Sequence, residues 1–205
     1  FNKVVVTADI ALPAEQTWTP IEGFGAFEFD GNGKTITGLT APLFGETNAY
    51  IHDLNLTDVV LNITDNGNSG AFARRLVKGA LVNCSATGTS TINCANYDSP
   101  ETINSYSVYA HGGLVGFVDG VTIDNCTNGV AITIQCVYAA KGGNEKRKTA
   151  IGGIAGAHVN LCSFTNLTNK GAISYKGTSQ KTTMYISGIV GRDVETSSLG
   201  NKNVA

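Results

Sequence analysis

Short runs of alternating apolar and polar residues follow one another along most of the chain. The runs are rich in Val, Ile and Thr, and Gly, Asn and Asp residues separate them. No segment carries apolar residues at the 3.6-residue period of an amphipathic helix over a useful length. The pattern therefore predicts an all-β fold in which helices are rare.

One two-part phrase repeats along the chain. Gly112–Gly116 reads Gly-Gly-Leu-Val-Gly and precedes Ile123–Cys126, and the phrase returns at Gly152–Gly156 with Phe164–Leu167. Weaker copies occur at Gly70–Phe72 with Leu81–Cys84 and at Leu43–Gly45 with Ile51–Leu54. The spacing between copies grows while each copy keeps its form, which is typical of stacked repeats that carry loops of variable length.

The second half of the phrase has a fixed form: an apolar residue, any residue, then Asn, Asp or Gly, then Leu or Cys. Its instances begin at Ile36, Ile51, Leu81, Ile123 and Phe164. The third position always holds a residue type that tolerates the left-handed backbone region. We predict that these residues form a column of corners, each turning one strand into the next. They are Gly38, Asp53, Asn83, Asn125 and Asn166.

A β-rich run follows each corner, so we expect three short strands per turn: the Gly-rich strand, the corner strand and this third one. One such turn cannot bury its apolar side alone, whereas stacked turns pair in parallel at about 4.8 Å and share a core. The predicted fold is a parallel β-helix, a solenoid that is right-handed by the general preference of parallel crossovers. The insertions all follow the third strand, so the long loops should emerge on one side. They cover about residues 64–69, 93–110, 135–150 and 176–186.

The whole chain, residues 1–205, is predicted to form a single domain. Residues 1–35 are a lead-in or cap, residues 36–191 hold the repeats, and residues 192–205 are a tail or the start of a further turn. The chain begins with Phe1 and not Met, and no charged-then-apolar leader follows. We therefore expect a mature form or a piece of a larger protein.

Composition narrows the class of protein. Apolar residues make up 42% of the chain and charged residues 15%, with 25 Gly and only 4 Pro. This is too apolar for a disordered protein and too rich in Gly for a helical bundle. A net charge of −2 provides no field that attracts nucleic acid. Since no stretch approaches the roughly 20 apolar residues of a spanning helix, we expect neither a nucleic-acid partner nor a membrane span.

The phrase Gly-Gly-Leu-Val-Gly followed by Ile-x-Asn-Cys resembles the GLUG repeat of bacterial cell-surface proteins. Residues 29–36 with residues 42–45 look like the segment that precedes such repeats in proteins of Bacteroides-type gut bacteria. The likeness covers roughly residues 27–191, although Gly70–Ala73 lacks the final glycine. Such proteins are described as adhesins or as similar to immunoglobulin A peptidases, and the repeats are not their catalytic part. The resemblance implies a parallel β-helix that is secreted or attached to the cell surface.

The cysteines are expected to be free. There are five, none in a Cys-x-x-Cys pair, and Cys84 and Cys126 share the last position of the corner signature. Side chains stacked in parallel would leave Cβ atoms near 4.8 Å apart, which is longer than the ~3.8 Å of a disulfide. We predict small, buried, unreactive thiols in this column.

Neither a metal site nor a cofactor is predicted. The three histidines are scattered along the sequence. Asp30–Gly33 looks like the start of a calcium loop, but Lys34 occupies the third ligand position and Ala41 the twelfth. A tight turn explains this segment better, because Asn-Gly is a strong hairpin signal.

No catalytic residue is predicted either. The 16 acidic residues are dispersed, and no two occupy the same signature position in neighbouring turns. We expect Asp119 to face Val159 or its neighbours in the next repeat and Asp124 to face Thr165, and His158 has no evident acidic partner. A polysaccharide lyase or glycoside hydrolase remains an alternative, because loops can assemble a site that spacing does not show.

The most suggestive surface feature is a set of tyrosines in or beside the insertions: Tyr97, Tyr106, Tyr109, Tyr138 and Tyr185. Tyrosine buries area on sugar rings and protein surfaces while keeping a polar tip. The alternative is that these rings only attach long loops to the flank of the fold. We expect a noncatalytic module for adhesion or binding that contacts a host or microbial glycan or surface protein through the loop face. A passive spacer within a larger surface protein is a further alternative.

Overall fold

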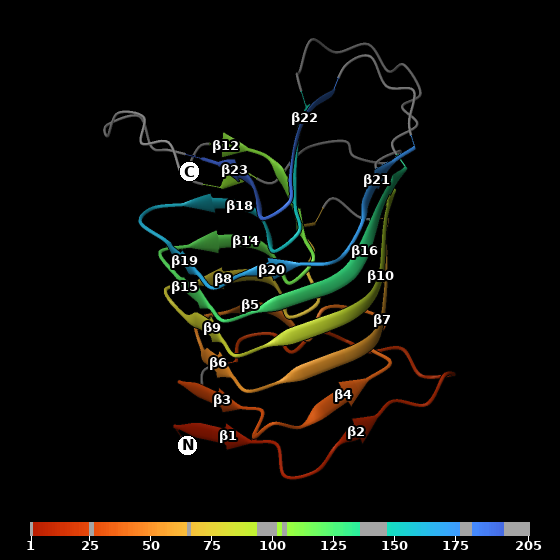
Figure 1. Ribbon diagram of the computed structural model, residues 1–205, viewed down its shortest axis with the longest axis vertical. Coiled ribbons are helices and arrows are strands. Elements are labelled where there is room, and N and C mark those ends of the chain that lie inside the picture. Colours follow the sequence, from red (N-terminus) through yellow and green to blue (C-terminus); the bar gives the residue numbers. More distant parts are fainter. Residues whose placement is uncertain are drawn as a thin grey trace.

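The computed structural model describes residues 2–24, 27–64, 67–93, 102–103, 106–135, 147–176 and 182–194. These residues form short β-strands and contain no helix, which confirms the all-β prediction (Figure 1). No helix in the described ranges could cross a membrane. Nearly all strands belong to four parallel sheets, here named A to D.

The sheets contain the following strands in spatial order. Sheet A holds β1 (Lys3–Val5), β3 (Glu28–Asp30), β6 (Tyr50–His52), β9 (Ala80–Val82), β15 (Thr122–Asp124) and β19 (Ser163–Thr165). Sheet B holds β2 (Ile10–Ala11), β4 (Thr35–Thr37), β7 (Asn55–Ile63), β10 (Ser85–Asn93), β16 (Thr127–Gln135) and β20 (Thr168–Asn169), and β21 (Ile173–Tyr175) also pairs with β16. Sheet C holds β5 (Phe44–Thr47), β8 (Ala73–Val77), β14 (Val115–Asp119), β18 (Ala155–Val159) and β23 (Val190–Asp193). Sheet D holds β13 (Tyr109–Gly112), β17 (Arg147–Gly152) and β22 (Thr182–Ser187). Separately, β11 (Thr102–Ile103) pairs antiparallel with β12 (Tyr106–Ser107).

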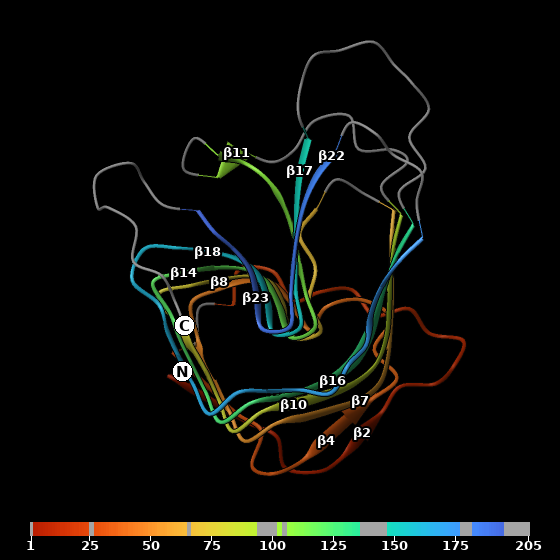
Figure 2. The same ribbon diagram turned by 45° about the horizontal axis from the view of Figure 1, so that its top comes forward.

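The chain visits the sheets in a fixed order. It runs through C, A and B as β5, β6 and β7, and then repeats this passage as β8, β9 and β10. Figure 2 shows the strands of successive passages lying over one another. The carboxyl-terminal ends of β10, β16 and β21 lie on the same side of the molecule. Sheet neighbours thus come from successive passages, so nearly every backbone pairing joins residues far apart in sequence.

The corner column is confirmed at four positions in sheet A. Asp53, Asn83, Asn125 and Asn166 have φ values of 52°, 54°, 51° and 52°. Asn83 Nδ2 donates to Asp53 Oδ1 at 3.0 Å, and Asn125 Nδ2 donates to Asn83 Oδ1 at 2.7 Å. Asn83 and Asn125 therefore tolerate the left-handed backbone, as Asn often does. Their side-chain amides also hydrogen-bond to the corner residue of the preceding passage.

The first corner was assigned to the wrong column. Ile36 lies in β4 and pairs with Leu56 of sheet B, although Gly38 does have a positive φ. The residue that pairs with Ile51 in sheet A is Phe29. Both Ile36 and Phe29 precede a turn with Gly, and the sequence pattern alone does not show which of two adjacent strands belongs to which sheet.

Several segments that were predicted to be loops form β-strands. Sheet D is built from segments that were taken as insertions, and it adds a fourth strand to each of the later passages. Its strands β13 and β17 pair from Tyr109–Thr149 to Gly112–Gly152. Val108 to Ala110 and Ala150 to Ile151 are fully buried, which explains why these segments order against the stack.

The core consists of stacked apolar side chains. Ile51, Leu81 and Ile123 are in register in sheet A and are all fully buried. Burial of one such side chain contributes roughly 1.5–3 kcal/mol. Asp119 faces Val159 and Asp124 faces Thr165, as predicted.

The supposed calcium loop is a turn. Asn32 has φ 51°, and its N–H donates to Asp30 Oδ1 at 2.7 Å. Gly33 follows with φ 69°. The carboxylate of Asp30 thereby caps its own turn, as Asp often does.

Candidate functional site

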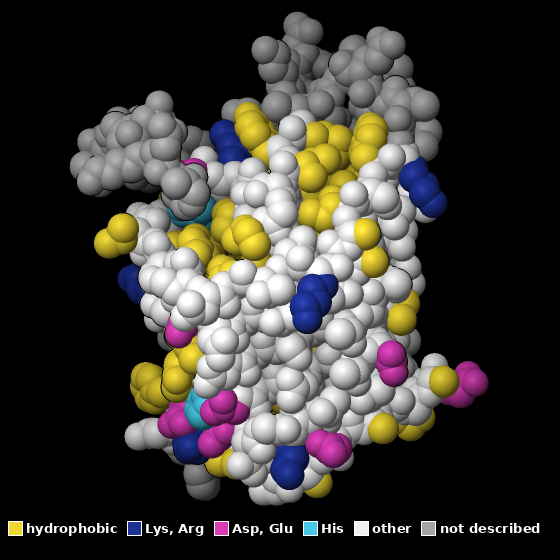
Figure 3. Space-filling view, in the orientation of Figure 1, with side chains coloured by type: hydrophobic (Ala, Val, Ile, Leu, Met, Phe, Trp, Pro, Cys, Tyr) yellow, Lys and Arg dark blue, Asp and Glu magenta, His cyan; other side chains and the backbone are white. Residues whose placement is uncertain are grey.

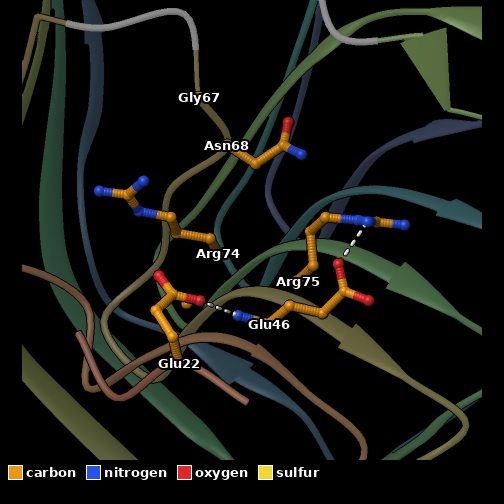
Figure 4. A pocket seen from close by; sticks show the side chains of 7 residues that line it. Glu22, Glu46, Gly67, Asn68, Arg74 and Arg75 are labelled. Atoms are coloured by element: carbon orange, nitrogen blue, oxygen red, sulfur yellow. Dashed lines mark hydrogen bonds and ion pairs between the residues drawn. The ribbon is translucent and has the colours of Figure 1, made fainter.

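A polar cleft lies beside the first strands of sheet C. Its volume is about 210 Å³, and Figure 4 shows the side chains that line it. Its lining consists of Glu22, Gly45, Glu46, Gly67, Asn68, Arg74 and Arg75. Two glutamates, two arginines and an asparagine therefore line one depression.

Sheet register positions the charged groups of the cleft. Glu46 of β5 pairs with Arg75 of β8, which pairs with Phe117 of β14. Arg75 Nη1 forms an ion pair with Glu46 Oε2 at 2.5 Å, and its guanidinium carbon lies 5.8 Å from the centre of the Phe117 ring. The ion pair and the cation–π contact hold the guanidinium on the sheet surface.

The other carboxylate is held by the backbone. Glu22 Oε2 accepts a hydrogen bond from the Glu46 N–H at 3.4 Å, as the dashed line in Figure 4 shows. The carboxylate lies directly over Gly45, where a Cβ atom would overlap it. Both carboxylates thus already accept hydrogen bonds, an arrangement that suits recognition of polar groups better than proton transfer.

A buried serine–histidine pair lies next to the cleft in sequence. Ser69 follows Asn68, and Ser69 Oγ lies 2.8 Å from His111 Nδ1. Ser69 is 1% exposed and His111 is fully buried. Burial lowers the pKa of His111 to about 3. An effective general base has a pKa near the working pH, so this imidazole is far too weak to activate the hydroxyl.

His111 should make folding sensitive to acid. Its folded pKa lies below the ordinary value of 6.5, so the unfolded chain binds the proton first as the pH falls. From pH 6.5 to pH 5 we expect a loss of about 2 kcal/mol through this one group. Urea unfolding of His111→Gln should be measured at both pH values. We expect the number of protons taken up on unfolding to fall by about one relative to the wild type, although the variant is less stable at pH 7. An unchanged pH dependence would show that His111 is not responsible.

Among the five predicted binding tyrosines, the structure describes the side chains of Tyr109 and Tyr185. Tyr109 is fully buried and packs with Ile92, Ile132, Ile134 and Ile151, so it serves the core and not a ligand surface. Tyr185 is partly buried, and the guanidinium carbon of Arg192 lies 4.6 Å from the centre of its ring. Tyr97 and Tyr138 lie outside the described residues, and for Tyr106 the structure describes only its place in β12.

Comparison with known proteins yields one structural relative. No known family matches the sequence, and no curated protein matches it. The fold is similar to the crystal structure of a putative immunoglobulin A1 protease from Bacteroides ovatus, with a TM-score of 0.58 and 18% identity. The match covers 94% of this chain and 67% of that protein. At this identity the likeness concerns the fold.

The prediction of free thiols is confirmed for the three cysteines that lie within the described residues. Cys84 and Cys126 are buried and Cys162 is partly buried, and all three are free. Burial raises the pKa of the Cys84 thiol well above its ordinary value. Such a thiol is a poor nucleophile. Cys94 and Cys136 lie outside the described residues.

Sequence reasoning missed the partners of the histidines. His158 Nε2 lies 3.6 Å from Asp193 Oδ1, although no acidic partner was evident from spacing. His158 and Asp193 are paired in β18 and β23 of sheet C. The signal was the repeated Gly-Gly phrase itself, because aligning Gly152–Gly156 with Ser187–Gly191 places the two residues side by side.

Proposed function

We propose that this chain is a noncatalytic binding module, built as a parallel β-helix and located outside the cell or on its surface. The observation that carries the proposal is the cleft lined by Glu22, Glu46, Arg74 and Arg75, in which Glu46 and the two arginines lie on the paired strands β5 and β8. The location rests on the resemblance to the repeats of bacterial surface proteins and on the Bacteroides ovatus structure of similar fold.

We infer that the ligand is a glycan rather than a charged protein surface. The cleft balances two guanidinium groups against two carboxylates, so it attracts neither polyanions nor polycations. Its volume lies below the 300–1,000 Å³ of sites for drug-sized ligands, and it suits a single sugar ring or chain end. Hydroxyl pairs on a sugar ring match the forked geometry of carboxylate and guanidinium groups.

Hydrolysis is less well supported on this surface. Glycosidases need one carboxylic acid that holds a proton and one carboxylate that is free to act. In the cleft the Glu46 carboxylate is occupied by its ion pair with Arg75, and Glu22 accepts from the backbone. The pair of Ser69 and His111 provides no nucleophile, because its base is too weak.

A glycan-binding screen with the full chain tests the proposal. We expect Arg75→Gln to weaken binding of the selected glycan at least about tenfold, since it removes both a forked donor and the ion pair that positions Glu46. Lys170→Gln is the control, because it removes a positive charge at an exposed site after β20 of sheet B, away from sheet C.

Three outcomes would contradict this assignment. Absence of binding to any glycan would refute the ligand class. Binding that survives Arg75→Gln but is lost in Tyr185→Ala would move the site from the cleft to the loop face. Release of shortened chains from a polysaccharide, abolished by Glu22→Gln, would establish an enzyme.

A further inference from the structure

A second cluster of functional groups lies on the outer face of sheet A, where the sheet begins. Glu28 and Asp30 are two residues apart in β3 and point outward, because Phe29 between them is buried. His52 of β6 pairs in register with Asp30, and Lys3 of β1 pairs with Glu28. Figure 3 shows acidic side chains gathered around a histidine on this open face.

The three side chains with metal-ligating atoms converge. One ligand atom each from Glu28, Asp30 and His52 lies within 4.8 Å of the other two. Small movements of these partly buried side chains would bring the atoms to the spacing found around one ion, whose bonds to N and O ligands are about 2.0–2.2 Å for zinc. All three side chains stand on paired strands, which position ligands more rigidly than loops do.

A fourth residue orients the imidazole. Asp53 Oδ2 lies 2.7 Å from His52 Nδ1, and Asp53 is itself held by the amide of Asn83 at 3.0 Å. With the proton on Nδ1 donated to Asp53, the lone pair of Nε2 points at Glu28 Oε1, 2.9 Å away. Two acceptors in this position repel each other unless a proton or a metal cation lies between them. A carboxylate that holds the far nitrogen of a ligating histidine is the usual support of a metal site.

We propose that Glu28, Asp30 and His52 form a binding site for a divalent transition-metal ion, with Asp53 as the group that orients the histidine. One imidazole nitrogen and two carboxylates suit zinc, and three protein ligands leave a position for water or for a partner's group. Calcium fits less well, because it takes six to eight oxygen ligands. No metal site was expected from the sequence, so this assignment revises that expectation.

Lys3 competes for the same place. Its Nζ lies 2.9 Å from Glu28 Oε1 and 2.9 Å from Asp30 Oδ2, between the two carboxylates. Its single charge balances only one of the three carboxylates of Glu28, Asp30 and Asp53. The Lys3 side chain is 44% exposed and flexible, so it can swing into solvent when an ion binds. Lysine thus acts as a weak internal substitute for the metal.

Calorimetric titration of the full, reduced chain with zinc chloride tests the site. We expect one zinc ion per chain, and at least about tenfold weaker binding in His52→Gln and in Asp30→Asn. Asp53→Asn should weaken binding by about tenfold, as changes behind a ligand typically do. Lys3→Met should tighten binding, because it removes the competing ammonium group.

The controls separate this site from other zinc-binding groups. His158→Gln removes another partly buried histidine with an acidic neighbour and should leave zinc binding unchanged. All five cysteines remain in every variant, so a thiol site would persist in His52→Gln. Circular dichroism confirms that each variant is folded.

Several results would overturn the assignment. If neither the wild type nor Lys3→Met binds zinc, the cluster is an ion-pair network in which His52 carries the second proton. Zinc binding that is equal in His52→Gln and the wild type would place the metal elsewhere. Calcium binding that exceeds zinc binding and survives His52→Gln would exclude the imidazole as a ligand.

Discussion

Replacing Gly113 with alanine should destabilise the protein by at least about 3 kcal/mol, because the new methyl group has no room. A Cβ atom at this position would overlap the side-chain amide of Asn128 and the carbonyl oxygen of Gly153 in the next passage. The carbonyl belongs to backbone and cannot rotate away, so the stacked strands themselves would have to separate. Urea unfolding followed by circular dichroism measures the loss.

The chain supplies its own control for this substitution. Gly188 occupies the same position in the last described passage, since Gly152 pairs with Ser187. Nothing lies within 4 Å of a Cβ atom built on Gly188, and its φ is not positive. Gly188→Ala should therefore leave stability unchanged within about 0.5 kcal/mol. Equal effects at the two positions would mean that backbone flexibility, and not stacking, explains the glycine.

This contact explains the Gly-Gly phrase more fully than the sequence did. The repeat of the phrase predicted stacked parallel strands, and that much is confirmed. The sequence pattern could not explain the second glycine, because the residue that contacts it, Asn128, lies in a different sheet. Gly153 repeats the contact with Asn169, so each glycine leaves space for an interior amide.

The candidate sites were harder to predict than the strands. Apolar periodicity reports which side chains face inward, and it correctly predicted Ile51, Leu81 and Ile123. It does not report register between strands of different passages. Assigning Ile36 and not Phe29 to the corner column hid the alignment of Asp30 with His52. The cluster on sheet A would have been visible in the sequence with that one register corrected.

The buried polar groups were missed for a related reason. His111 and Asn128 are fully buried, although residues of their types are more often exposed. Tyr109 was assigned to the surface because it falls within the predicted insertion of residues 93–110. Only the pairing of β13 with β17 in sheet D and the burial of the paired residues show that this segment is interior.

Asn128→Asp should cost about 3–5 kcal/mol at pH 7, since it places an unpaired charge in the interior. Asn128 Nδ2 donates to Asn169 Oδ1 at 2.9 Å and to the carbonyl oxygen of Val130 at 3.2 Å. Its Oδ1 accepts from the Val130 N–H at 2.9 Å. In the aspartate variant the second oxygen would face two other acceptors without a proton between them.

The same substitution has a diagnostic pH dependence. Burial and the facing oxygens must raise the pKa of the new carboxyl group above its unfolded value, because only its protonated form can donate. The native state then binds the additional proton, so the variant should regain stability relative to the wild type as the pH falls from 7 to 5. Asn125→Asp is the matched control, because Asn125 belongs to the same repeat but is exposed, in the column of corner residues where it donates to Asn83. It should cost at most about 1 kcal/mol, and a similar loss in both variants would contradict an interior hydrogen-bond network at Asn128.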